Sequence, residues 1–103
     1  MYQLIFLPIA RQDMIDIVQY ISHNLSNPLA ASALANEMVE AAEQLCSFPY
    51  INVVHQTKKP LKHEYRKLFV KKYIMFYCVD EKEKLIMIAR VIYARRDHEN
   101  FLQ

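Results

Sequence analysis

The sequence has no glycine among its 103 residues. A phosphate-cradling loop needs glycine, because its backbone must approach the phosphate closely, so nucleotide binding through a glycine-rich loop is excluded. Tight turns also favour glycine, which adopts positive φ without a steric penalty. The turns of this chain must therefore be made by Lys, Asp or Glu, at some cost in stability.

Cysteine and long apolar runs are also scarce. The only cysteines, Cys46 and Cys78, lie in apolar segments, which is typical of thiols in a reducing cytosol, and the histidines show no ligand spacing. We therefore expect no disulfide, metal site or cofactor. The longest run without Asp, Glu, Lys, Arg or His, residues 24–36, is too short and too polar to span a bilayer. The opening residues lack a basic region before their apolar run, so we expect no signal peptide and a cytoplasmic location.

Basic residues are rare in the first half of the chain. Residues 1–57 contain Arg11 as their single base against five acids, a net charge of −4, whereas residues 58–103 have a net charge of +6. Two interpretations remain open. The basic half has an acidic partner, either nucleic acid or an acidic protein segment, or it is a solvated face without a partner.

Three apolar runs dominate the second half. Residues 65–70, 73–79 and 84–93 are rich in β-branched and aromatic side chains, and polar residues at 71–72 and 80–83 separate them. Runs of this length bounded by polar clusters predict a meander of three antiparallel strands. Such a sheet normally buries one face, so the rest of the chain must supply its cover.

The first half predicts a strand and two helices. Residues 1–7 form a short apolar run, and residues 9–23 and 28–47 repeat apolar side chains at helical spacing. A proline stands at the first turn of each helix, where it fits well. The two helices should form an antiparallel hairpin. Residues 50–63 have weak periodicity and predict a loop leading into the sheet.

These elements predict a single α+β domain over residues 1–103, in the order β-α-α-β-β-β, with the hairpin packed on one face of a twisted antiparallel sheet. The tyrosines of the sheet should pack at the edges of the core with their hydroxyls in solvent. They are Tyr65, Tyr73, Tyr77 and Tyr93. The expected core residues are Ile17, Ile21, Leu34, Met38 and Leu45 of the helices with Phe76, Cys78, Ile86 and Ile88 of the sheet.

Several stretches in order resemble one family over nearly the whole chain. They are DIVQYI followed by NPLAA, then LCSFP, YRKLFVKKYIMFYCVD and IARVIYARRD. This series resembles the RelE/ParE superfamily of toxins from type II toxin–antitoxin (plasmid stabilisation) systems, and lies closer to the ParE branch. The resemblance implies a small sheet crossed by two N-terminal helices, and a cognate antitoxin as partner. The family usually has Gly or Asn where Lys71 and Lys72 stand.

The resemblance leaves the activity open. RelE-like members are mRNA interferases, endoribonucleases that cut messenger RNA on the ribosome using basic residues and often a C-terminal tyrosine. ParE-like members keep the scaffold and inhibit DNA gyrase by binding. A third possibility is an inactive scaffold that binds only its antitoxin, with operator DNA bound only through that complex.

The match to the nuclease residues is partial. By the resemblance, Arg66 and Lys67 correspond to the bases of the second strand, and Arg96, with Arg95 beside it, corresponds to the last-strand arginine. Ile74 stands where the family has a third-strand arginine, so one of the charges needed at the scissile phosphate is missing.

The C-terminal tyrosine of the nuclease has no counterpart either, because Leu102 stands near that position, with His98 close by as a candidate general acid or base. Two apolar positions favour the gyrase-binding branch. The catalytic candidates, if the chain is a nuclease, are Arg66, Lys67, Arg95, Arg96 and His98. The candidates for contact with the target or antitoxin are Lys62, Arg66, Lys71, Lys72, Arg90, Arg95 and Arg96.

For three of these arginines the sequence also allows a purely structural role. Arg90 interrupts the apolar alternation of its strand, so it either faces solvent or is a partly buried, paired charge. Arg95 and Arg96 either contact the target or form a strand-end salt bridge with Asp97 or with an acid of a helix.

Overall fold

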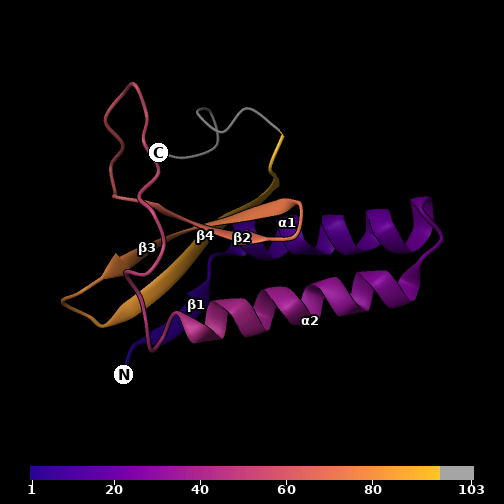
Figure 1. The fold of residues 1–103 in the computed structure, drawn as a ribbon, viewed down its shortest axis with the longest axis horizontal. Helices are drawn as coiled ribbons and strands as arrows, with labels where there is room; N and C mark the ends of the chain where they lie inside the picture. Colours follow the sequence, from indigo (N-terminus) through magenta and orange to yellow (C-terminus); the bar gives the residue numbers. More distant parts are fainter. Residues whose placement is uncertain (96–103) are drawn as a thin grey trace.

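The computed structural model describes residues 1–95. These form β1 (Gln3–Phe6), α1 (Pro8–Gln19), a π-helical turn η1 (Tyr20–Asn24), α2 (Pro28–Gln44), β2 (Arg66–Val70), β3 (Tyr73–Asp80) and β4 (Leu85–Tyr93). The two helices form an antiparallel hairpin on one side of the sheet (Figure 1). The α+β class and the order of elements predicted from the sequence are confirmed.

The ends of the helices follow from local chemistry. Pro8 opens α1, and Pro28 opens α2 behind Asn27, whose side chain accepts a hydrogen bond of 3.2 Å from the N–H of Ala30. The first helix widens into the π turn η1 instead of continuing regularly to residue 23 as expected. Within residues 1–95, no helix has the length and apolar character needed to cross a membrane.

The sheet has the strand order β1-β4-β3-β2. β2, β3 and β4 form the predicted antiparallel meander, but β1 pairs in parallel with β4, with Gln3 opposite Leu85. The sheet is therefore mixed, whereas the sequence led us to expect only antiparallel strands. A parallel neighbour needs a long connection rather than a hairpin, and the helices and the meander together supply it.

Lysine makes both tight turns of the meander, as the absence of glycine required. Lys71 begins the β2–β3 turn with φ of 54°, and Lys84 ends the β3–β4 turn with φ of 55°. Ser26 adopts φ of 51° between the helices. Each such residue costs on the order of 1 kcal/mol relative to a favoured conformation, so the surrounding packing must hold these turns in place.

A β-bulge interrupts β4. Phe76 pairs with Arg90 and Tyr77 pairs with Ile88, which leaves Ala89 as an extra residue on β4. The bulge shifts the alternation of β4 by one position. Positions beyond Ala89 therefore face the side of the sheet opposite to the one that simple alternation predicts.

The helices cover one face of the sheet and form the main core with it. The buried members of this core are Ala10, Leu34, Met38, Ala42, Leu45, Val70, Met75, Tyr77, Ile86, Ile88 and Val91. The expected contributions of Leu34, Met38 and Leu45 are confirmed, and Ile17 and Ile21 pack against this core as partly buried residues.

The expected places of Phe76 and Cys78 in this core were wrong. They alternate with Met75 and Tyr77 along β3, so their side chains lie on the other face of the sheet. A second core forms there and is covered by the segment between α2 and β2. Its buried residues are Tyr65, Ile74, Phe76, Cys78, Ala89 and Ile92. Residues 50–63 are thus a loop, as predicted, but one that covers the second sheet face.

Tyr77 also departs from the expected edge position. Its side chain is fully buried, and its hydroxyl donates a hydrogen bond of 3.0 Å to the carbonyl of Pro49. Burial raises the pKa of Tyr77, so the hydroxyl remains a donor at neutral pH. Tyr77 therefore joins the main core to the loop that follows α2.

Replacing Leu45 by alanine should lower the free energy of unfolding by about 2–5 kcal/mol, because a fully buried leucine at the end of α2 leaves a cavity. Urea denaturation measures the loss. Leu29→Ala, on the exposed part of the same helix, should change stability by less than about 0.5 kcal/mol. Equal losses in the two variants would contradict the assigned core face.

Candidate functional site

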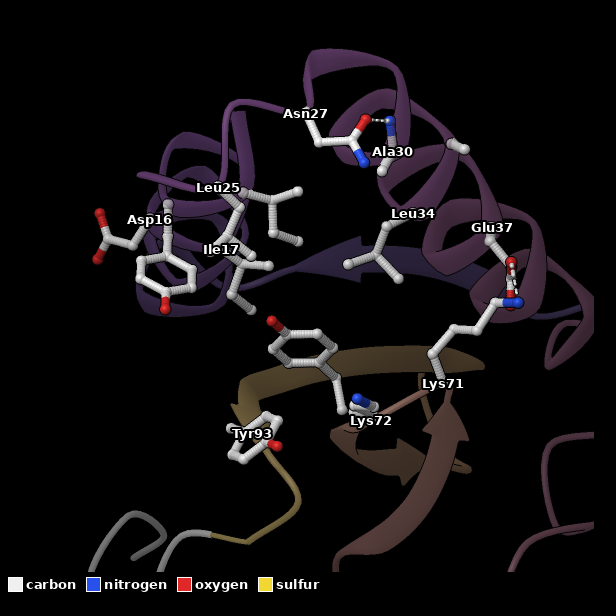
Figure 2. A pocket seen from close by; sticks show the side chains of 14 residues that line it. Asp16, Ile17, Leu25, Asn27, Ala30, Leu34, Glu37, Lys71, Lys72 and Tyr93 are labelled. Atoms are coloured by element: carbon white, nitrogen blue, oxygen red, sulfur yellow. Dashed lines mark hydrogen bonds and ion pairs between the residues drawn. The ribbon is translucent and has the colours of Figure 1, made fainter. Parts of the chain in front are cut away.

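A groove of about 1190 Å³ lies between the tip of the helical hairpin and the end of the sheet. Figure 2 shows Ile17 and Leu25 on one side of it and Leu34 on the other, with their side chains directed between the elements. The remaining lining residues are Asp16, Tyr20, Ile21, Asn27, Ala30, Ala33, Glu37, Lys71, Lys72, Tyr73 and Tyr93. The floor is apolar and the rim is polar, which suits an amphipathic helix of a partner.

Charged residues of both signs stand at the rim of the groove. Lys71 and Lys72 come from the β2–β3 turn, and Lys71 forms an ion pair of 3.9 Å with Glu37 of α2 (Figure 2). Both side chains of this pair are largely exposed, so it contributes at most about 1 kcal/mol and a partner can replace it.

Two tyrosines close the sheet end of the groove. The rings of Tyr73 and Tyr93 meet edge to face, with centroids 5.7 Å apart. Burial first, and the neighbouring Tyr93 and Tyr20 hydroxyls second, raise the pKa of Tyr73. The Tyr73 phenol therefore stays neutral and offers a hydrogen-bond donor beside the apolar floor.

The basic candidates predicted from the sequence do not form one cluster. Lys71 and Lys72 lie at one end of β2 and Arg66 lies at the other, roughly 13 Å away along a five-residue strand. Lys62 is exposed in the loop before β2, and Arg95 is exposed directly after β4. Arg96 and His98, like Leu102, lie outside the described residues.

Arg66 is engaged in holding the loop that follows α2. Its guanidinium donates a hydrogen bond of 2.7 Å to the carbonyl of Asn52 and lies 5.0 Å from the ring centre of Tyr50. It also forms an ion pair of 3.5 Å with Glu64. The N–H donors of the guanidinium therefore point toward other parts of the chain, and the side chain stabilises the loop. The backbone N–H of the neighbouring Lys67 donates a hydrogen bond to the carbonyl of Val53.

A carboxylate ties the same loop to the far end of the sheet. Glu81 accepts hydrogen bonds from the hydroxyls of Tyr2 at 2.6 Å and Tyr50 at 2.5 Å, and it is paired with Lys84. Lys84, then Tyr2 and Tyr50, lower the pKa of Glu81 to about 2, and Glu81 in turn raises the pKa of Tyr50 to about 12. The cluster joins β1, the loop and the β3–β4 turn.

Two further positions considered for chemistry, Ile74 and Cys78, are buried. Ile74, which the family resemblance places where a nuclease has an arginine, is 1% exposed in the second core. Burial, with a smaller effect of Asp80, raises the pKa of the Cys78 thiol, so it is a poor nucleophile. No group of three or more His, Cys, Asp or Glu side chains among residues 1–95 is arranged to hold a metal ion.

Arg90 is the partly buried, paired charge that the sequence left open as one alternative. Its guanidinium donates to both carboxylate oxygens of Asp13, at 2.8 Å and 3.0 Å, and the backbone N–H of Val91 donates to the same carboxylate at 2.9 Å. The hydrogen bonds with Asp13 raise the pKa of Arg90. The pair locks α1 onto β4.

Sequence reasoning missed Asp13, Tyr20 and Leu25. Asp13 is one of two acids of α1, both away from its apolar positions in the sequence pattern, and only the tertiary structure supplies its partner. Tyr20 and Leu25 carried a signal, because large apolar side chains are unexpected in the connection between two surface helices. Their exposure at the groove marks them as candidate contact residues.

Comparison with known proteins gives a consistent result. The family model described as the ParE toxin of the type II toxin–antitoxin system parDE matches residues 4–98. A chain of the chromosomal ParDE toxin–antitoxin system from P. aeruginosa is similar in fold, with a TM-score of 0.74 and 20% identity over 92% of this chain and 98% of that one.

A chain of the toxin–antitoxin complex RelBE2 from Mycobacterium tuberculosis is also similar, with a TM-score of 0.58 and 20% identity over 89% of this chain and 96% of that one. At this identity the two structures establish the fold alone. No match was found among the curated proteins.

Replacing Asp13 by alanine should destabilise the fold by about 3 kcal/mol, since it leaves the Arg90 charge partly buried and removes the acceptor of the Val91 N–H. Thermal or urea unfolding measures this loss. Asp16→Ala, one turn of the same helix away and exposed, is the matched control and should cost less than about 0.5 kcal/mol. A silent Asp13→Ala would show that the pair contributes little.

Proposed function

Because this chain belongs to the family of ParE toxins of type II toxin–antitoxin systems, we propose that it inhibits growth by binding DNA gyrase in the cytoplasm. A cognate antitoxin keeps it silent. Its action is binding rather than catalysis.

The main support for binding rather than catalysis is the structural role of the residues at the nuclease positions. A ribonuclease of this fold needs cations at the scissile phosphate. At two of the corresponding described positions, Arg66 holds the loop through Asn52, and Ile74 is buried in a core. Neither side chain is available to a phosphate. Exposed basic residues at the strand ends, such as Arg95, are instead suited to contact with a protein surface.

The groove supports the antitoxin as partner. The two solved structures described above both come from toxin–antitoxin systems. An amphipathic antitoxin helix would bury Leu25 and Tyr20, which the free chain exposes, and acidic residues on the helix would meet Lys71 and Lys72. Occupation of the groove would also hold the antitoxin beside the basic strand ends that are proposed to contact the target.

A comparison of two assays tests the target. The protein is added to a gyrase supercoiling reaction and, separately, to a translating extract in which messenger cleavage is mapped by primer extension. We expect inhibited supercoiling with intact messenger. Arg95→Ala should weaken the inhibition by about tenfold, as loss of an interface arginine does, while Arg11→Ala, an exposed arginine of α1, should not.

Other outcomes of these assays would overturn the proposal. Messenger cuts at defined codon positions that vanish in Arg95→Ala would establish the alternative, a ribosome-dependent endoribonuclease with a variant catalytic set. No effect in either assay, with the antitoxin still bound, would leave an inactive antitoxin-binding scaffold.

Variants of two leucines test whether the antitoxin binds in the groove. Leu25 lines the groove and is 56% exposed, whereas Leu29 lies outside it on α2 and is 84% exposed. Leu25→Glu should weaken antitoxin binding at least about tenfold, because a buried apolar contact becomes a buried charge. Leu29→Glu should leave the affinity unchanged. Calorimetric titration measures the affinity of each variant for the antitoxin. Equal affinities would show that the antitoxin binds another surface.

A further inference from the structure

The outer edge of β2 is only half covered. The segment before β2 pairs with its first residues: Lys67 donates its N–H to the carbonyl of Val53 at 3.0 Å, and His55 donates to the carbonyl of Tyr65 at 2.7 Å. This short pairing ends at Lys67, because the chain turns away at Asn52, whose carbonyl is held by Arg66. The second half of β2 has no strand beside it among the described residues.

The open half presents backbone hydrogen-bonding groups. Inward and outward backbone groups alternate along an edge strand, so Phe69 points its N–H and carbonyl outward, as Lys67 does two residues earlier. Within residues 1–95, no hydrogen bond to these two groups of Phe69 is found. The side chain of Phe69 is 57% exposed on the face of the sheet that carries its partner Ile74. An unpaired donor, an unpaired acceptor and an exposed ring together form a template for an added strand.

The charges beside Phe69 favour an acidic sequence in any strand added to this edge. A second copy of the chain, paired antiparallel about Phe69, would place its Lys71 opposite Lys67. Like charges opposite one another are destabilising, and Val53 already occupies that place. An acidic side chain opposite Lys71 is favourable instead. The edge therefore disfavours self-association and favours an acidic, extended segment of another protein.

The open edge also continues the groove. Lys71 and Lys72 end the edge of β2 and at the same time stand on the rim of the groove. A chain that leaves the groove at this turn arrives directly at Phe69. Joining the two contacts in one partner makes the second contact intramolecular, so even a strand of a few residues adds substantially to the affinity.

We propose, on the basis of the toxin function proposed above, that the open edge of β2 accepts an extended segment of the cognate antitoxin as a fifth strand. This segment carries an apolar residue opposite Phe69 and an acidic residue two positions along, opposite Lys71. The antitoxin thus holds the toxin by a helix in the groove and a strand on the sheet, on either side of the β2–β3 turn.

Amide hydrogen exchange, followed by NMR on the toxin co-purified with the antitoxin encoded beside it, tests the added strand. The Phe69 amide should exchange at least about tenfold more slowly in the complex than in the free toxin, because it gains a hydrogen bond. The Leu4 amide is the matched control, since it points outward from β1 at the opposite edge of the sheet, and its exchange should not change.

A pair of variants separates the backbone contact from the side chain. Phe69→Thr removes the ring and keeps the N–H, whereas Phe69→Pro removes both. Proline is tolerated on an edge strand where the N–H faces outward. Affinity for the antitoxin should fall further in Phe69→Pro than in Phe69→Thr, by about five- to tenfold, the effect of one lost hydrogen bond.

The outcomes distinguish this inference from the proposed function. A complex that forms with an unprotected Phe69 amide would overturn the added strand and leave the toxin function intact. Failure of any complex to form would reject both. Protection of Phe69 in the concentrated toxin alone would assign the edge to a second copy of the chain, against the charge argument.

Discussion

The fold depends on a carboxylate placed where β1 stops. β1 pairs with β4 only as far as Leu7, whose N–H reaches the carbonyl of Ile88. Beyond that point β4 has lost its neighbour, and Asp13 of α1 takes over by accepting hydrogen bonds from the Val91 N–H and from Arg90. The two side chains are only 17% and 14% exposed, so removing either one leaves a poorly solvated charge and costs more than the loss of a surface ion pair. It closes the edge of the central strand and sets the position of the helical hairpin.

The absence of glycine concentrates strain at the turns. Lysine takes the positive φ of both meander turns, and one of them, Lys71, also stands on the groove and at the end of the open edge. A lysine at this turn costs backbone energy but supplies a charge that glycine would not. One of the two positive-φ residues of the meander thus lies at the surfaces proposed for partner binding, and strained residues often occur at such sites.

The polar contacts around the loop after α2 give Arg66 a structural role, at a position that the family resemblance assigns to a nuclease base. Arg66, Tyr77 and Glu81 each hold a part of this loop, through Asn52, Pro49 and Tyr50 respectively. With the loop fixed, the second face of the sheet is covered and Ile74 is buried. A basic residue at a family position is therefore insufficient to identify a catalytic site, because its geometry decides whether it meets a substrate or another part of the fold.

The sequence alone determined the class of fold, the order of its elements and the family resemblance. Helical periodicity after Pro8 and Pro28 and the apolar runs after Tyr65 are local patterns, and local patterns survive in the folded chain. Composition also predicted that Lys, Asp or Glu makes the turns, since no glycine was available, and the structure shows lysine at both positive-φ positions.

Only the tertiary structure decided how these elements meet. The parallel place of β1, the extra residue Ala89 and the partner of Arg90 each depend on chain segments that lie far apart in sequence, 77 residues in the case of Arg90 and Asp13. The bulge at Ala89 shifts the alternation of β4 by one position, which the apolar pattern alone does not reveal. The alternation of β3 places Phe76 and Cys78 on the face that the helices do not cover. The groove and the open edge arise in the same way, because a surface shared by distant segments exists only once the strands have paired and the helices have packed.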